Sequence, residues 1–154
     1  MNTLGIRVEP KKTTFVVIEA VQEIYQVVNN EVIKVPAALD FPEKLKYIRN
    51  CVLDILREYS ISVAGIRVTE GNSQNMDITR LQIEGVIQEA FSSSDVQHYF
   101  SGRKTSISSR LKINTDDFDE IIKGRKEFKQ VGNWELLRNS PSREATLAAM
   151  GALY

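Results

Sequence analysis

The sequence predicts an α/β fold in which helices cover both faces of a mixed sheet. The first third is rich in short runs of β-branched and apolar residues, and the remainder alternates amphipathic helical patterns with short apolar strands. The order is three antiparallel strands, helix, strand, helix, strand and further helices, which gives five strands, the last two parallel. The length of 154 residues suits a single domain spanning 1–154.

The first third reads as an antiparallel meander. TLGIRV (3–8) and TTFVVIEA (13–20) are strand patterns, and Pro10 opens a turn between them. EIYQVV and EVIKV flank Asn29 and Asn30, residues that tolerate the left-handed conformation of hairpin turns. The sequence therefore predicts a hairpin turn at this asparagine pair.

The middle of the chain alternates helices and buried strands. Asp40 is a suitable N-cap for a helix over 41–59, whose apolar residues form one stripe at helical spacing. The continuous apolar run 62–68 is typical of a strand buried in a parallel sheet. Asp77 predicts the start of a second helix, and 96–100 predicts a fifth strand.

Two more helices are predicted near the end of the sequence. TDDFDEIIKGR (115–125) predicts a short helix that ends at Gly124. Ser140 is the expected cap of a helix over 140–153, and its many alanines predict close packing on the sheet.

Composition excludes several classes of site. The 20 basic and 20 acidic residues balance, which argues against a surface that is cationic throughout. Cys51 and His98 are single, so an internal disulfide and Cys-rich or His-rich metal sites are excluded, and any metal would be Mg²⁺, Mn²⁺ or Ca²⁺ on carboxylates. No apolar run reaches the roughly 18–20 residues of a membrane span, and no signal-peptide pattern is present, so a cytoplasmic location is expected.

Three motifs resemble those of a known superfamily. LGIRVEP resembles the first-strand motif G-I-D-P-G, with Gly5 and Ile6 in place. Glu70 follows the strand 62–68, and REATLAAMGAL places Glu144 where a last-helix carboxylate is found. With the order of elements, these motifs resemble the RNase H-like superfamily, in particular the RuvC-type Holliday-junction resolvases.

The resemblance implies a two-metal nuclease, yet the first-strand acid is replaced by Arg7. A guanidinium has no lone pair for a metal, so we expect Arg7 to pair with Glu70 or Glu144, and we expect no cofactor. The favoured interpretation is a catalytically degenerate, uncharacterised RuvC-like protein, a pseudo-nuclease. The alternative is a displaced carboxylate site of Glu9, Glu70 and Glu144 in an active Mg²⁺- or Mn²⁺-dependent endonuclease on structured nucleic acid.

The partner is either a protein or nucleic acid, and a homodimer is left open. The interpretation assigns an accessory role in nucleic-acid processing or defence; a stoichiometric inhibitor or immunity-type protein is a third hypothesis. Candidate phosphate-binding residues are Arg103, Lys104, Arg110, Lys112, Lys126 and Lys129. The acidic residues between these basic stretches would cancel much of their positive electrostatic field.

Overall fold

A computed structural model describes residues 1–72 and 74–154. The strands in this part of the chain are β1 (Asn2–Val8), β2 (Thr13–Val21), β3 (Ile24–Ile33), β4 (Ile61–Arg67), β5 (His98–Gly102) and β6 (Val131–Gly132). The α-helices are α1 (Phe41–Glu58), α2 (Ile78–Ser92), α3 (Lys104–Leu111), α4 (Thr115–Ile122) and α5 (Ser140–Ala152). A short 3₁₀ helix covers Trp134–Leu136.

The sheet has six strands in the order β5-β4-β1-β2-β3-β6. The antiparallel meander β1-β2-β3 and the parallel additions β4 and β5 are as predicted. The prediction of five strands was wrong, because β6 pairs in parallel with Tyr25 and Gln26 of β3. Two residues are too few to produce a strand pattern in a sequence, so this pairing depends on tertiary packing.

The predicted hairpin turn at Asn29 and Asn30 was also wrong. Both residues lie inside β3, and the β2–β3 turn is made by Gln22 and Glu23, with φ of 50° and 64°. Two consecutive left-handed residues give the tight turn that fits the twist of a hairpin. The asparagines instead follow a register shift, since Ile18 pairs with Val27 but Val17 pairs with Asn29.

The helices are close to their predicted ranges. Asp40 accepts a hydrogen bond from Glu43 N at 3.0 Å, and Asp77 accepts one from Arg80 N at 2.8 Å, so both predicted caps are confirmed. The cap of α5 is Asn139 rather than Ser140. Helix α3 was not predicted, because its eight residues carry only a weak apolar pattern.

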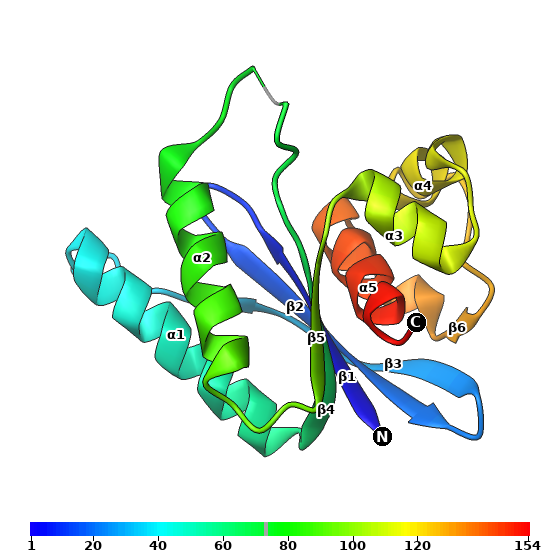
Figure 1. The fold of residues 1–154 in the computed structure, drawn as a ribbon, viewed down its shortest axis with the longest axis horizontal. Helices are drawn as coiled ribbons and strands as arrows, with labels where there is room; N and C mark the ends of the chain where they lie inside the picture. The colour runs from blue at the N-terminus through cyan, green and yellow to red at the C-terminus, as the bar shows by residue number, and fades with distance from the viewer. Residues whose placement is uncertain (73) are drawn as a thin grey trace.

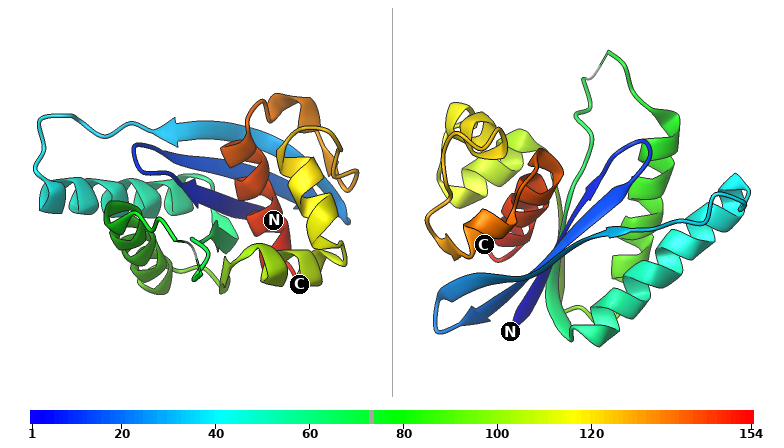
Figure 2. Two further views of the ribbon diagram at one scale, coloured as in Figure 1. Left: turned by 90° about the horizontal axis from the view of Figure 1, so that it is seen from above. Right: turned by 180° about the vertical axis from the view of Figure 1, so that it is seen from behind.

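Two helical layers enclose the sheet, which Figure 1 shows roughly edge-on, with α1 and α2 on one side and α3, α4 and α5 on the other. Successive side chains of β1 and β4 point to opposite faces of the sheet, so the core consists of two clusters, one on each face. Leu4, Ile6 and Ile66 pack with α1 and α2, whereas Val63 packs with α5. The other two views in Figure 2 show the same separation of the helices by the sheet. Residues 3, 5 and 7 of β1 therefore face α5.

Candidate functional site

The tetrapeptide Gly-Ile-Arg-Val occurs twice, at 5–8 and at 65–68. The two copies lie side by side, because β1 and β4 are parallel neighbours in which Arg7 pairs with Arg67. Arg7 was a predicted site residue and Arg67 was not, although the repeated tetrapeptide is a signal that points to both.

Glycine in both copies lets α5 lie directly on the sheet. A Cβ at Gly5 would be 1.8 Å from Ala145 O, and one at Gly65 would be 2.2 Å from Ala148 O. Such distances are far inside van der Waals contact, so only glycine permits this approach. Because each arginine follows its glycine by two residues on the same face, α5 brings Glu144 over both guanidinium groups.

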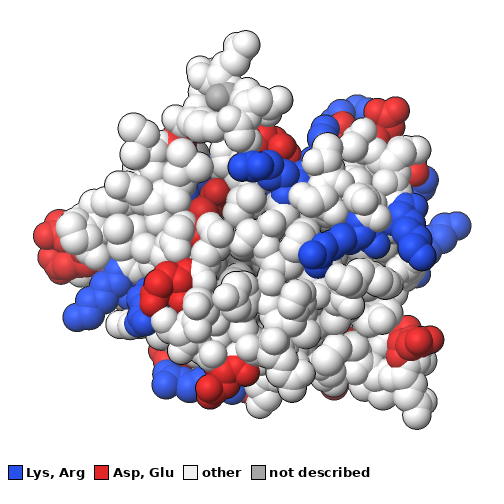
Figure 3. All heavy atoms as spheres, viewed as in Figure 1, with Lys and Arg blue, Asp and Glu red and all other residues white. Residues whose placement is uncertain are grey.

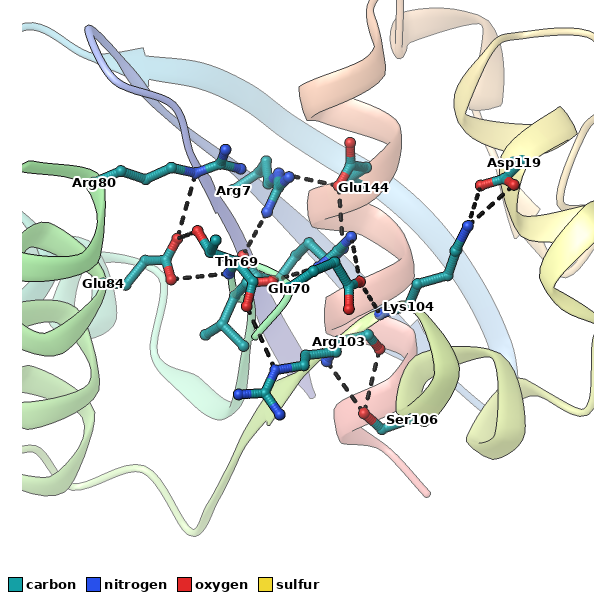
Figure 4. A network of polar contacts seen from close by, with 12 residues as sticks. Arg7, Thr69, Glu70, Arg80, Glu84, Arg103, Lys104, Ser106, Asp119 and Glu144 are labelled. Atoms are coloured by element: carbon teal, nitrogen blue, oxygen red, sulfur yellow. Dashed lines mark hydrogen bonds and ion pairs between the residues drawn. The ribbon is translucent and has the colours of Figure 1, made fainter. Parts of the chain in front are cut away.

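Glu144 receives both arginines. Arg7 Nε lies 3.0 Å from Glu144 Oε2, and Arg67 Nε lies 3.2 Å from the same atom. Arg7 Nη1 also donates to Arg67 O at 3.1 Å, and Arg67 Nη1 donates to Val68 O. The predicted pairing of Arg7 with Glu144 is therefore present, and Figure 4 shows the two side chains pointing toward one another.

Glu70 connects this group to α3. Its Oε1 lies 2.9 Å from Arg67 Nη2 and accepts a hydrogen bond from Lys104 N at 3.0 Å. A carboxylate at a helix start is favoured by the exposed N–H groups and the macrodipole. Arg7, Arg67, Glu70 and Glu144 are called the strand-end cluster below; its two guanidiniums and two carboxylates cancel in charge.

Three of the four side chains in the strand-end cluster are largely removed from water, whereas that of Glu70 is 34% exposed. The side chain of Arg67 is 7% exposed, and those of Arg7 and Glu144 are each 12% exposed. Burial lowers the pKa of Arg7 to about 10, although the charge of Glu144 opposes that shift. At neutral pH Arg7 remains cationic, so it stays matched to Glu144.

The donor set of the strand-end cluster does not fit a divalent cation. Mg²⁺ requires near-octahedral oxygen ligands at roughly 2.0–2.1 Å. The nearest approaches to Glu144 Oε2 and Glu70 Oε1 are instead guanidinium nitrogens, which repel a metal. Among residues 1–72 and 74–154, no group of three or more His, Cys, Asp or Glu side chains is placed to hold a metal ion.

Glu9 does not join Glu70 and Glu144. Its Oε1 lies 3.8 Å from Lys12 Nζ, and its backbone N donates to Lys12 O in the β1–β2 turn. The three carboxylates of the displaced metal site are therefore not brought together. Position 9 lies beyond the end of β1 and has no β2 partner. Strand pairing therefore does not hold the Glu9 side chain on the same face of the sheet as Arg7.

A second buried carboxylate supports the loop that carries Glu70. Glu84 of α2 accepts hydrogen bonds from Thr69 N at 2.9 Å and Thr69 Oγ1 at 2.7 Å. Arg80 Nε lies 3.4 Å from Glu84 Oε2, the oxygen that also accepts from Thr69 Oγ1. Sequence reasoning missed Thr69, Arg80 and Glu84, because no motif connects residues that meet only through the β4–α2 loop.

Of the six predicted phosphate-binding residues, some side chains already contact other groups of the protein and others are exposed without an ion-pair partner among the described residues. Lys104 lies 3.1 Å from Asp119, and Lys126 lies 2.9 Å from Asp117. Arg110 lies 3.8 Å above the Phe100 ring and donates to Gly151 O and Tyr154 O, which gives it a packing role.

Apart from Arg110, three of the six basic side chains have no carboxylate partner among the described residues. Arg103, Lys112 and Lys129 are exposed, and none has an ion-pair partner in the described part of the chain. The side chain of Arg103 donates from Nε to Thr69 O at 3.4 Å. On the face seen in Figure 3, basic atoms form separate patches rather than one continuous band.

Comparison with protein family models gives no match, and comparison with curated proteins gives none either. Solved structures do match. Thermus thermophilus RuvC superposes with a TM-score of 0.74 at 14% identity, over 98% of this chain and 92% of that chain. The fold is RNase H-like, of the RuvC type.

Two further structures agree with this fold. T. thermophilus RuvC in complex with a Holliday junction substrate has a TM-score of 0.73 at 16% identity, over 98% of this chain and 91% of that chain. The yeast mitochondrial Holliday junction resolvase has a TM-score of 0.61 at 14% identity, over 96% of this chain and 75% of that chain.

None of the described helices is both long and apolar enough to cross a bilayer.

Proposed function

We propose that this chain is a non-cleaving RuvC-like protein that serves as a binding or accessory subunit in nucleic-acid processing. The observation that carries the proposal is the position of Arg7 and Arg67, both within 3.2 Å of Glu144 Oε2. The strand-end cluster balances its own charge, so a metal would have to displace two cations from a buried carboxylate.

A metal and the two arginines would compete for the same carboxylates. Two unit charges 4 Å apart interact by about 4 kcal/mol at an effective dielectric near 20. If a metal ion bound Glu144, each arginine would lose its attraction to that carboxylate. Both guanidinium groups would also repel the metal ion. The guanidinium carbon of Arg67 also lies over the Phe118 ring, 5.9 Å from its centre, at the outer range of a cation–π contact.

Binding of nucleic acid is supported by the exposed cations. T. thermophilus RuvC, a structural neighbour, is found in complex with a Holliday junction. Arg103, Lys112 and Lys129 are exposed here and can neutralise phosphates, whereas Lys104 and Lys126 would first have to leave Asp119 and Asp117. Because affinity for phosphates grows with the number of cations engaged, we expect modest, strongly salt-dependent binding.

The test combines cleavage with metal linkage. The protein is incubated with a labelled four-way junction in Mg²⁺ or Mn²⁺, and its melting temperature is followed as either ion is added. We expect no cleavage and no metal-dependent rise in melting temperature, because a ligand stabilises only the state that binds it. Glu70→Gln serves as the control variant, and it should behave like the unmodified protein in both assays.

Cleavage that depends on metal and is lost in Glu70→Gln would overturn the proposal in favour of an active endonuclease. Tight binding to one protein, with no junction binding at low salt, would instead favour an inhibitor. Junction binding that weakens steeply with salt and does not require metal is the expected result.

A further inference from the structure

A cavity of about 440 Å³ opens on the side of the sheet that carries α1 and α2. It lies among the β1–β2 turn, the segment between β3 and α1, and the first turns of α1 and α2. The strand-end cluster contributes no residue to its lining, and neither do α3 and α4. Nothing in the proposed function accounts for this cavity.

The floor of the cavity is apolar. Ile48 of α1 and Ile83 of α2 line it and are only 3% and 7% exposed, and the half-buried Val35 and Phe41 complete it. Ile83 follows Thr79, another lining residue, by one helical turn, so the same face of α2 forms one wall. Exposed apolar surface continues just before that wall, where Ile78 is 71% exposed.

The rim of the cavity is cationic. Lys11, Lys12 and Lys44 line it, and its lining contains no carboxylate. Lys12 has one ion pair, with Glu9 at 3.8 Å, while Lys11 and Lys44 have none among residues 1–72 and 74–154. The acidic caps of α1 and α2 are already engaged by their own backbone N–H groups.

We propose that this lysine-rimmed cavity is a docking site for an acidic amphipathic segment of a partner protein. An apolar floor with an unpaired cationic rim is complementary to a helix that carries apolar side chains on one face and carboxylates beside them. Apolar side chains of the partner would cover the half-buried Val35 and Phe41, and its carboxylates would reach Lys11 and Lys44. This inference does not depend on nucleic-acid binding or on the state of the strand-end cluster.

The test uses a defined probe. A fluorescent helical peptide of about 18 residues, with Leu at helical spacing and Glu elsewhere, is titrated with the whole protein by anisotropy. A matched peptide carries Lys in place of Glu. We expect the acidic peptide to bind and the basic peptide not to bind.

Charge reversal in the protein gives the matched comparison. Lys11→Glu/Lys44→Glu should weaken binding of the acidic peptide by about tenfold or more and allow binding of the basic peptide. Lys34→Glu/Lys46→Glu changes two lysines outside the cavity lining by the same net charge, and it should leave the affinity for the acidic peptide nearly unchanged. Melting temperatures of both variants check that they fold.

Three outcomes would overturn the docking proposal. The acidic peptide fails to bind up to about 1 mM, which corresponds to a negligible affinity. Both charge-reversal variants lose affinity equally, which would indicate a diffuse field. A single-stranded oligonucleotide displaces the peptide and loses affinity in the cavity variant alone, which would make this a nucleic-acid site.

Discussion

The strand-end cluster and the surface of α3 and α4 both pair basic with acidic side chains, but in opposite surroundings. In the cluster, Arg67 and Glu144 are 7% and 12% exposed and hold one another inside the protein. On α4 and the segment after it, Lys126 and Asp117 are 53% and 34% exposed and meet in water. Burial, more than the number of charges, therefore decides which ion pairs determine structure.

The largest expected effect follows from removing the shared carboxylate. Glu144→Ala leaves two buried guanidiniums without their partner, so we expect the free energy of unfolding to fall by about 3 kcal/mol. Lys126→Ala, at the exposed pair, should lower it by less than about 0.5 kcal/mol. Urea denaturation followed by circular dichroism measures both, and equal losses would remove the distinction between the two regions.

A similar loss is expected where α5 contacts the sheet. Gly5→Ala would place a methyl group 1.8 Å from Ala145 O, so α5 must shift, at a cost of about 3 kcal/mol in unfolding free energy. Gly85→Ala is the matched control, because nothing lies within 4 Å of its Cβ and alanine is the better helix former. That variant should be more stable by about 0.5–1 kcal/mol. A neutral Gly5→Ala would show that α5 does not require this close approach.

The exposed cations should affect binding rather than stability. Arg103→Ala/Lys112→Ala/Lys129→Ala should reduce the slope of log affinity for a four-way junction against log salt by about 2–3. Lys126→Ala should leave that slope unchanged, because its ammonium group is engaged by Asp117. Binding at several salt concentrations measures the slope, and an unchanged slope in the triple variant would place the phosphates elsewhere.

The smallest expected effect concerns an exposed pair between α1 and α2. Hydrogen bonds from Arg49, at 2.6 Å, and from Ser93 lower the pKa of Glu89 from 4.5 to about 2. A carboxyl group with a lowered pKa stabilises the fold above its unfolded pKa, and this contribution disappears as the pH falls from 4.5 toward 2. Glu89→Gln should therefore be slightly less stable than the unmodified protein at pH 6 and equal to it near pH 2. Urea denaturation midpoints of both proteins are measured from pH 2 to pH 6. A difference between the two proteins that does not change with pH would contradict the lowered pKa of Glu89.

Most helices and strands of the fold could be predicted from local sequence patterns. Strand and helix periodicities, with caps such as Asp40 and Asp77, predicted the elements and their order, because those signals lie within short windows. The two-residue strand β6 and the turn at Gln22 were not predicted, since tertiary pairing and backbone conformation decide them. The register shift beside Asn29 shows that the asparagine pair marked an irregularity in the strand rather than its end.

The candidate site was predicted less completely. Arg7, Glu70 and Glu144 come together, but Glu9 turns to Lys12 because β1 has already ended. Arg67 was missed because its role appears only once the two Gly-Ile-Arg-Val segments are placed in register. Nothing in a linear sequence states that register.

The proposed function requires that Arg7 and Arg67 exclude a divalent metal from Glu144. Crystals soaked in Mn²⁺ test it most directly, through anomalous scattering. We expect no manganese peak between Glu70 and Glu144, with Arg7 Nε still at ion-pair distance from the Glu144 carboxylate. A manganese ion bound by both carboxylates, with the arginines turned away, would contradict it.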